Sequence, residues 1–139
     1  MAKAGFFAEY CSVHRFHYGT PRRPLEQVIK QGGVMILDVD VQGAFKLKKV
    51  YPRAITIFIL PPSITALRKR LKRRGTESKE QLKVRFQNAK REMKLFRKFE
   101  YVVINDDLNT AVRQVLSIID SHHCRTKNLN LEQILKITG

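Results

Sequence analysis

The sequence predicts an α/β fold with a parallel β-sheet, because short apolar runs alternate along the chain with segments of helical pattern. Three of these runs are continuous and have the length of buried parallel strands: residues 34–39, 54–60 and 101–104. The chain has 139 residues, and 43% of them are hydrophobic, which is enough for one domain with a core. No internal repeat or low-complexity linker divides the sequence.

The apolar pattern and the turn residues together give an expected order of elements. The predicted elements are strand 7–13, turn 17–21, helix 24–30, strand 34–39, helix 41–50, strand 54–60, helix 64–73, helix 79–96, strand 101–104, helix 108–121 and a short last helix 131–137.

Prolines, glycines and small polar residues mark the ends of these elements. Pro24 can open the first helix, and the Gly32-Gly33 pair can close it. Pro61 and Pro62 stop the strand 54–60, and Ser63 can cap the helix that follows. That helix is predicted to end at Gly75, and a second capped turn over 76–80 opens the next one.

The two longest predicted helices are recognised by their apolar faces. Leu82, Val84, Phe86, Ala89, Met93 and Phe96 recur at partly helical spacing in the first, and Ala111, Val115, Ile118 and Ile119 are expected to face inward in the second.

The charge of the chain is strongly positive, with 27 Lys and Arg residues against 12 Asp and Glu residues and a formal net charge of +15. Such a chain attracts anions, whether nucleotides, nucleic acid or acidic surfaces, and basicity alone does not choose among them. The apolar runs are too short to span a bilayer, and no signal-peptide pattern opens the chain. Cys11 and Cys124 lie far apart, which favours reduced thiols in a cytoplasmic protein.

A first group of candidate binding residues combines acids with a phenol and a hydroxyl. Ionised Glu9 offers two acceptor oxygens to the N1–H and 2-amino groups of a guanine, and Thr20 can donate to the base carbonyl oxygen. Tyr18 can donate to a phosphate oxygen. Asp38 and Asp40 lie at the carboxyl end of a predicted strand, where ligands bind in open α/β sheets. Considered alone, a Glu on a strand such as Glu9 is more often solvated than ligand-binding. An Asp at a strand end, such as Asp38 or Asp40, is often a helix cap.

A second group lies where two predicted helices meet at a turn that contains Gly75. Arg70 and Arg74 are four residues apart and share a helix face, and Arg85 lies on the next helix. Arginines on such an arm could clamp phosphates when the arm closes. The alternative is a solvated basic face.

A third group follows the strand 101–104. The side-chain amide of Asn105 could contact a nucleotide base, whereas Asp106 or Asp107 is better explained as the N-cap of the next helix.

Six segments, in this order and at this spacing, resemble successive blocks of the guanylate kinase family: residues 7–9, 18–20, 36–43, 57–63, 70–77 and 103–108. The resemblance covers about residues 1–120 and implies the P-loop fold of nucleoside monophosphate kinases. It implies that Glu9 and Thr20 read guanine, that Tyr18 holds the GMP phosphate, and that Asp38 and Asp40 lie near the nucleotides and magnesium. It places Arg70, Arg74 and Arg85 among the catalytic and lid arginines, with Asn105, Arg70 and Arg74 on the ATP side.

The sequence departs from the family pattern at His17 and at Ala8-Glu9-Tyr10, where the family more often has Leu-Glu-Trp, but the main departure is a missing segment. It contains no GxxxxGKS or GxxxxGKT, the P-loop that cradles the ATP phosphates. In the family, the P-loop strand lies between the strands that match 34–39 and 54–60. We therefore expect a truncated form with an unpaired sheet, poor phosphoryl transfer and a tendency to self-associate.

The expected organisation is a guanylate-kinase-like domain over 1–121 and a C-terminal tail over 122–139. Within the domain, about 6–20 is the GMP-binding segment and 70–85 the lid. The resemblance implies GMP and ATP with Mg²⁺ as ligands, no membrane and no specific nucleic acid. The alternative function is a non-catalytic module that binds GMP or a phosphopeptide. A nucleic-acid binder driven by charge alone is a third hypothesis, against which stands the lack of an aromatic stacking platform.

Overall fold

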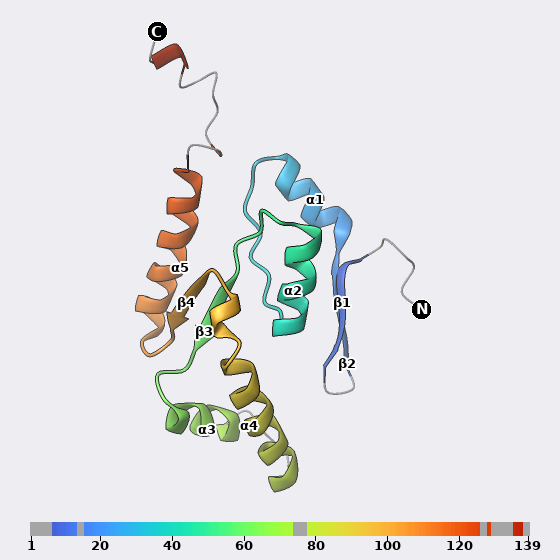
Figure 1. Cartoon of the computed structure of the whole chain (residues 1–139), viewed down its shortest axis with the longest axis vertical. Coiled ribbons are helices and arrows are strands. Elements are labelled where there is room, and N and C mark those ends of the chain that lie inside the picture. Colours follow the sequence, from blue (N-terminus) through green and yellow to red (C-terminus); the bar gives the residue numbers. More distant parts are fainter. Residues whose placement is uncertain (1–6, 14–15, 74–77, 126–127, 129–134, 138–139) are drawn as a thin grey trace. The chain divides into compact units, whose positions relative to one another are not determined.

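The computed structural model describes residues 7–13, 16–73, 78–125, 128 and 135–137 (Figure 1). The chain divides into two compact units, Met1–Thr56 and Ile57–Gly139, here called the N-terminal and the C-terminal unit. The N-terminal unit holds β1 (Phe7–Val13), β2 (Phe16–Pro21), α1 (Arg22–Lys30) and α2 (Val41–Val50). The C-terminal unit holds β3 (Ile57–Leu60), α3 (Ile64–Arg73), α4 (Lys79–Met93), the 3₁₀-helix η1 (Phe96–Lys98), β4 (Tyr101–Ile104) and α5 (Leu108–His123).

In the N-terminal unit, an antiparallel hairpin of β1 and β2 is covered by α1 and α2 (Figure 1). Its core is built from Ala8, Leu25 and Leu47, one residue each from β1, α1 and α2. Four half-buried residues pack against this core: Met35, Leu37, Val39 and Tyr51. Because Ala8 belongs to this core, the core packs against the strand that also carries Glu9.

The prediction of a turn over 17–21 was wrong, because these residues belong to strand β2. Pairing with β1 outweighs the turn-forming character of glycine and proline here. Gly19 lies against the ring of Phe7, and a Cβ at this position would come within 2.7 Å of the ring. Pro21 is the last residue of the strand, where a residue without a backbone N–H is tolerated in the hydrogen-bond ladder. The glycine thus serves close packing rather than a turn.

Helix α1 begins two residues before the predicted start, at Arg22. Pro24 lies within the first turn, where no backbone N–H has a partner inside the helix. The predicted glycine stop is confirmed. Gly32 adopts a φ of 72°, its N–H donates to the Ile29 carbonyl at 3.0 Å, and the Gly33 N–H donates to Val28 at 2.9 Å. These two bonds form a Schellman motif, which requires a left-handed residue at this point.

The prediction of a buried strand over 34–39 was also wrong, because these residues form no strand. Alternate side chains still divide between two environments. Met35, Leu37 and Val39 pack on the core, whereas Ile36 is 70% exposed. Apolar character can direct such packing, but a strand exists only where a neighbouring backbone accepts and donates its hydrogen bonds. In the part of the chain that the structure describes, no strand pairs with this segment.

The C-terminal unit contains the predicted parallel strands. β3 pairs with β4 in the register Ile57↔Tyr101 to Leu60↔Ile104, and α5 packs on β4 (Figure 1). β4 has the predicted bounds, whereas β3 begins three residues later than predicted, at Ile57, where the pairing begins. Val103 and Ala111 are buried between strand and helix, at 2% and 6% exposure. The mixed α/β architecture with a parallel sheet is confirmed.

Side-chain caps begin three of the helices at the predicted places. The Ser63 hydroxyl accepts from the Ala66 N–H at 3.0 Å and begins α3. Ser78 and Gln81 form a reciprocal capping box at the start of α4. Asp107 accepts from the Thr110 N–H at 2.8 Å and begins α5, as the cap interpretation expected. Gly75 lies outside the described residues.

Two helices end at other places than predicted. α4 ends at Met93 instead of 96, because the chain tightens there into i→i−3 bonds, such as Leu95 N–H to Glu92, and continues as η1. α5 runs two residues further than predicted, to His123. Of the predicted helix 131–137, residues 135–137 are helical and the rest lies outside the described residues. No helix in the described ranges has the length and apolar character of a membrane span.

Candidate functional site

Glu9 and Thr20 form the centre of the site in the N-terminal unit. They face each other across the β1–β2 hairpin, and the Thr20 hydroxyl donates to Glu9 Oε1 at 3.0 Å. The strand register shifts between Phe7 and Glu9. Such an irregularity breaks the in–out alternation of a strand, and it allows the neighbours Ala8 and Glu9 both to be buried, at 4% and 6% exposure.

The burial of Glu9 has a chemical consequence. An ionised carboxylate is costly to bury unless hydrogen bonds satisfy it. Thr20 supplies one such bond, to Oε1. Because a carboxylate has about four acceptor positions, Glu9 keeps the capacity to accept N–H donors from a ligand. A buried acid beside a hydroxyl donor is therefore able to read a base that presents two adjacent N–H groups.

Asp40 and Gly43 complete this site from the start of α2. Asp40 is the N-cap of the helix, and its Oδ1 accepts from the Gly43 N–H at 2.7 Å. A Cβ placed on Gly43 would lie 3.0 Å from this oxygen and 3.6 Å from Glu9 Oε2. Gly43 therefore lets the cap of α2 and the carboxylate of Glu9 approach each other. Sequence reasoning gave Gly43 no role. Glycine is less favourable than alanine within a helix, so a glycine in the first turn of a predicted helix can indicate that a side chain would not fit there.

The remaining predicted residues of this unit are placed less centrally. Asp38 is exposed in the segment before α2. Tyr18 pairs with Cys11 through the hairpin backbone, and its side chain is outside the part that the structure describes. In the described residues, no group of three or more His, Cys, Asp or Glu side chains forms a metal site. Asp38 and Asp40 nevertheless suit Mg²⁺, which proteins commonly hold by one or two carboxylates together with substrate phosphates.

In the C-terminal unit, Arg70 and Asn105 are brought together. The Arg70 guanidinium on α3 donates to the backbone carbonyl of Asn105 at 2.8 Å. The N–H of Asn105 donates in turn to the Leu60 carbonyl at the end of β3, also at 2.8 Å. The backbone after β4 is thus fixed from two sides. Arg85 is half-buried on α4, and Arg74 lies outside the described residues.

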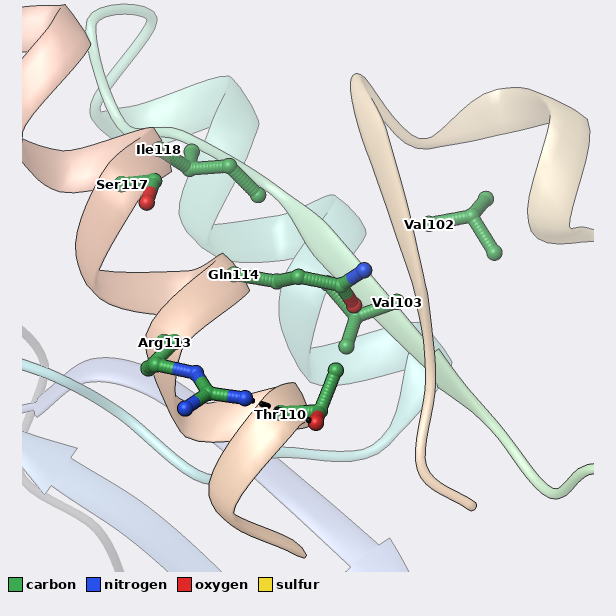
Figure 2. Close-up of a pocket in the computed structure, with 7 residues that line it drawn as sticks. All are labelled: Val102, Val103, Thr110, Arg113, Gln114, Ser117 and Ile118. Atoms are coloured by element: carbon green, nitrogen blue, oxygen red, sulfur yellow. Dashed lines mark hydrogen bonds between the residues drawn. The ribbon is translucent and has the colours of Figure 1, made fainter. Parts of the chain in front are cut away.

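Two hollows lie in the C-terminal unit. The smaller, about 180 Å³, is lined by the end of β3 and by α3, including Arg70. The larger, about 340 Å³, lies between β4 and α5 (Figure 2). Along one wall of the larger hollow, the Arg113 guanidinium donates to the Thr110 hydroxyl at 3.1 Å (Figure 2). None of the residues that the sequence singled out as candidates lines this larger hollow, so we assign it no part in the site.

Tyr51 and Asp107 have shifted pKa values. Burial and then the nearby Glu26 carboxylate raise the pKa of the Tyr51 hydroxyl. The backbone N–H of Thr110 and then its hydroxyl lower the pKa of the exposed Asp107. The first is explained by packing on the core of the N-terminal unit, and the second by the capping of α5.

Comparison with known proteins identifies the family of the chain. The family model of guanylate kinase matches residues 1–122. A guanylate kinase from Caldanaerobacter subterraneus subsp. tengcongensis is 41% identical over 137 residues, which are 99% of this chain and 66% of that protein. One from Helicobacter pylori is 42% identical over 132 residues, 95% of this chain and 64% of that protein.

A solved structure gives the same result. The crystal structure of guanylate kinase from Anaplasma phagocytophilum superposes with a TM-score of 0.79 at 28% identity, over 95% of this chain and 64% of that one. The chain spans just under two thirds of the length of the curated relatives it matches. With a family model that matches most of its length, the chain belongs to the guanylate kinase family.

Proposed function

We propose that this chain carries the GMP-binding and lid parts of a guanylate kinase, which transfers the γ-phosphoryl group of ATP to GMP to give ADP and GDP. The reaction belongs to cytoplasmic purine nucleotide metabolism. The observation that carries the proposal is the buried Glu9 carboxylate with the Thr20 hydroxyl bonded to it. Family membership supports it, since guanylate kinases act on these substrates.

In this proposal, guanine recognition depends on the hairpin. Glu9 accepts from the N1–H and 2-amino groups of the base. Thr20 has one O–H, which donates to Glu9 Oε1 in this structure, so it turns from Glu9 to the base carbonyl oxygen when GMP binds. An adenine in the same position presents no N1–H and would leave the buried carboxylate without donors, which is costly. Residues 6–20 therefore form the GMP-binding segment, with Tyr18 on the phosphate.

The phosphate-transfer side is proposed for the C-terminal unit. Arg70, Arg74 and Arg85 stabilise charge on the transferring phosphoryl group, and residues 70–85 form the lid. Asn105 and Arg70 lie on the ATP side, and the hydrogen bond that the Arg70 guanidinium donates to the Asn105 carbonyl supports this pairing. When Mg²⁺ is bound with ATP, it neutralises phosphate charge, and Asp38 or Asp40 would hold it. These parts belong to one domain over 1–121, with a tail over 122–139.

Self-association through the β3–β4 sheet is a further part of the proposal. Parallel strands are normally covered on both faces, yet Ile59 and Ile104 are 48% and 56% exposed. Sedimentation velocity over a hundredfold range of protein concentration tests this. A single monomeric species throughout would contradict it.

Calorimetry on the purified 139-residue chain tests the proposal of GMP binding. We expect saturable binding of GMP and much weaker binding of AMP. A phosphopeptide serves as the third ligand, because binding of the phosphopeptide in preference to GMP would indicate the non-catalytic module instead. Failure of all three ligands to bind would contradict the proposal.

Turnover is a separate measurement. The 139 residues contain no P-loop sequence, whose backbone N–H groups and lysine bind the charge that grows during phosphoryl transfer. We therefore expect the 139-residue chain to bind GMP but to form GDP from ATP, GMP and Mg²⁺ only slowly. Robust GDP formation by this polypeptide would show that it does not need the cradle.

A further inference from the structure

The α3–α4 helical hairpin concentrates the positive charge of the chain. The described residues 64–73 and 78–98, which include this hairpin and η1, hold thirteen Lys and Arg residues against two Glu residues. Neither helix has a buried residue. The hairpin is therefore an exposed and strongly positive surface, and Arg70 and Arg85 account for only two of these charges.

Four lysines form a row along one side of α4 and its C-cap residue, Lys94. Lys79, Lys83, Lys90 and Lys94 are spaced by four, seven and four residues, so they fall within about 60° of arc on a helix with 3.6 residues per turn. All four are exposed. At 1.5 Å per residue, the row is about 22 Å long. We call these four residues the lysine row.

Arg68 of α3 lies beside the lysine row, because it contacts the same aromatic ring as Lys90. The ring of Phe86 lies 5.0 Å from the Arg68 guanidinium and 6.0 Å from the Lys90 ammonium. Favourable contact of both cations with one aromatic ring offsets part of their mutual repulsion. Arg68 and its i+4 neighbour Lys72 are both exposed, so they extend the positive surface from α4 onto α3.

We infer that this surface binds the sugar-phosphate backbone of a nucleic acid without reading its sequence. A strand of nucleic acid carries one phosphate about every 3.4 Å, so a 22 Å row lies beside six or seven phosphates. Lysine ammonium groups act toward phosphate as compact point charges on flexible stems, without the rigid planar fork of an arginine, so a row of lysines suits a repeating phosphate backbone of any sequence. The lysine row belongs to the C-terminal unit, whereas the GMP-binding residues Glu9 and Thr20 belong to the N-terminal unit.

A linear polyanion fits this surface better than an anionic membrane does. Helices that lie in a membrane interface present an exposed apolar face beside the basic one. On α4, the large apolar residues near the lysine row, Leu82, Phe86 and Met93, are half-buried, and Val84 is the exposed exception. The hairpin therefore presents positive charge but no broad exposed apolar face that could insert into a membrane.

Fluorescence anisotropy on the full 139-residue chain tests the inference. The probes are a labelled 20-nucleotide single-stranded RNA of mixed sequence and a 20-base-pair DNA duplex, with vesicles of phosphatidylcholine and phosphatidylserine as a third arm. The test variant is K79Q/K83Q/K90Q/K94Q. The matched control is R23Q/K30Q/K49Q/K136Q, which removes four equally exposed charges outside the hairpin from the same +15 chain.

The inference predicts a clear difference between the two variants. Four phosphate contacts give a slope of log affinity against log salt of about −2.8 on single strands, so parent and control should lose about 50-fold in affinity between 50 and 200 mM salt. The lysine-row variant should bind at least tenfold more weakly at 50 mM salt and lose only a few-fold over the same range. Far-UV circular dichroism should be unchanged in it, which separates loss of binding from loss of folding.

Three results would overturn the inference. Equal losses of nucleic-acid affinity in the two variants would mean that the net charge of the chain, and not the lysine row, causes binding. If neither nucleic acid binds at 50 mM salt, the surface is not a nucleic-acid-binding site. Binding to the vesicles that depends on the lysine row, without binding to either nucleic acid, would identify a membrane surface instead.

Discussion

The hydroxyl of Thr20 donates a 3.0 Å hydrogen bond to Glu9 Oε1 across the β1–β2 hairpin, and Glu9 is only 6% exposed. This bond orients a buried carboxylate from the neighbouring strand. The irregular register before Glu9 and the close approach of Gly43 allow the acid to occupy this position. The structure thus combines a strand irregularity, a hydroxyl donor and a helix start around one acceptor.

Replacing Thr20 by Val should weaken GMP binding by up to about tenfold, since it removes the hydroxyl proposed to donate to the base carbonyl oxygen and such a bond contributes about 0.5–1.5 kcal/mol. It should also lower the free energy of unfolding by about 1–3 kcal/mol, because Glu9 stays buried without its donor. Calorimetry and urea denaturation measure the two effects. Thr20→Ser, which keeps the hydroxyl, is the control, and an equal loss in it would show that the hydrogen bond is not the cause.

Replacing Gly43 by Ala should reduce GMP affinity with little change in stability. The new Cβ would meet Asp40 Oδ1 at 3.0 Å and the Val39 side chain at 3.2 Å, which disturbs the cap of α2 beside Glu9. Alanine in a helix gains about 0.5–1 kcal/mol over glycine, and this gain offsets part of the strain. GMP titration together with thermal unfolding tests the separation. Full GMP affinity in Gly43→Ala would mean that the close approach has no role in binding.

Asp40 is expected to stabilise α2 as a cap whatever its role toward the nucleotides. Asp40→Ala should cost about 1 kcal/mol in the free energy of unfolding, whereas Asp40→Asn should cost little, since Asn caps helices as well as Asp does. Urea denaturation of the two variants gives the comparison. If Asn and Ala are equally destabilising, the charge of Asp40 matters more than its cap.

The start of α5 should weaken in acid. Thr110 lowers the pKa of Asp107 in the folded chain below its ordinary value of 3.8. A lowered pKa means that the unfolded chain binds the proton more readily, so the stabilisation is present above pH 3.8 and is lost as the pH falls through the folded value. The amide side chain introduced by Asp107→Asn can cap the helix but cannot titrate. The difference in melting temperature between parent and variant should therefore shrink from pH 5 to pH 3, and a constant difference would contradict this.

Local signals predicted most of the helices. Ser63, Ser78 and Asp107 each begin a helix where the sequence places a cap, because a cap needs only its own side chain and the next few backbone N–H groups. The Gly32-Gly33 stop is local in the same way. These features depend on neighbours within about five residues, which a sequence displays directly.

Features that depend on distant partners could not be predicted in this way. The segment 34–39 has the composition of a buried strand, but no strand pairs with it in the described part of the chain. Residues 17–21 look like a turn, but pairing with β1 makes them a strand. The approach of Gly43 to Glu9 joins residues that are 34 positions apart. The resemblance to a family supplied Glu9 and Thr20 as a pair, and the structure added the bond between them.

The central claim is that Glu9 reads guanine, and the most direct test is calorimetry with GMP, IMP and AMP on the parent chain and on Glu9→Gln. GMP offers Glu9 the N1–H and the 2-amino group, IMP only the N1–H, and AMP neither. We predict affinities that fall in the order GMP, IMP, AMP for the parent, by about tenfold or more at each step, and that nearly converge in Glu9→Gln. If Glu9→Gln keeps the same discrimination among the three nucleotides as the parent, Glu9 does not read the base and the account is wrong.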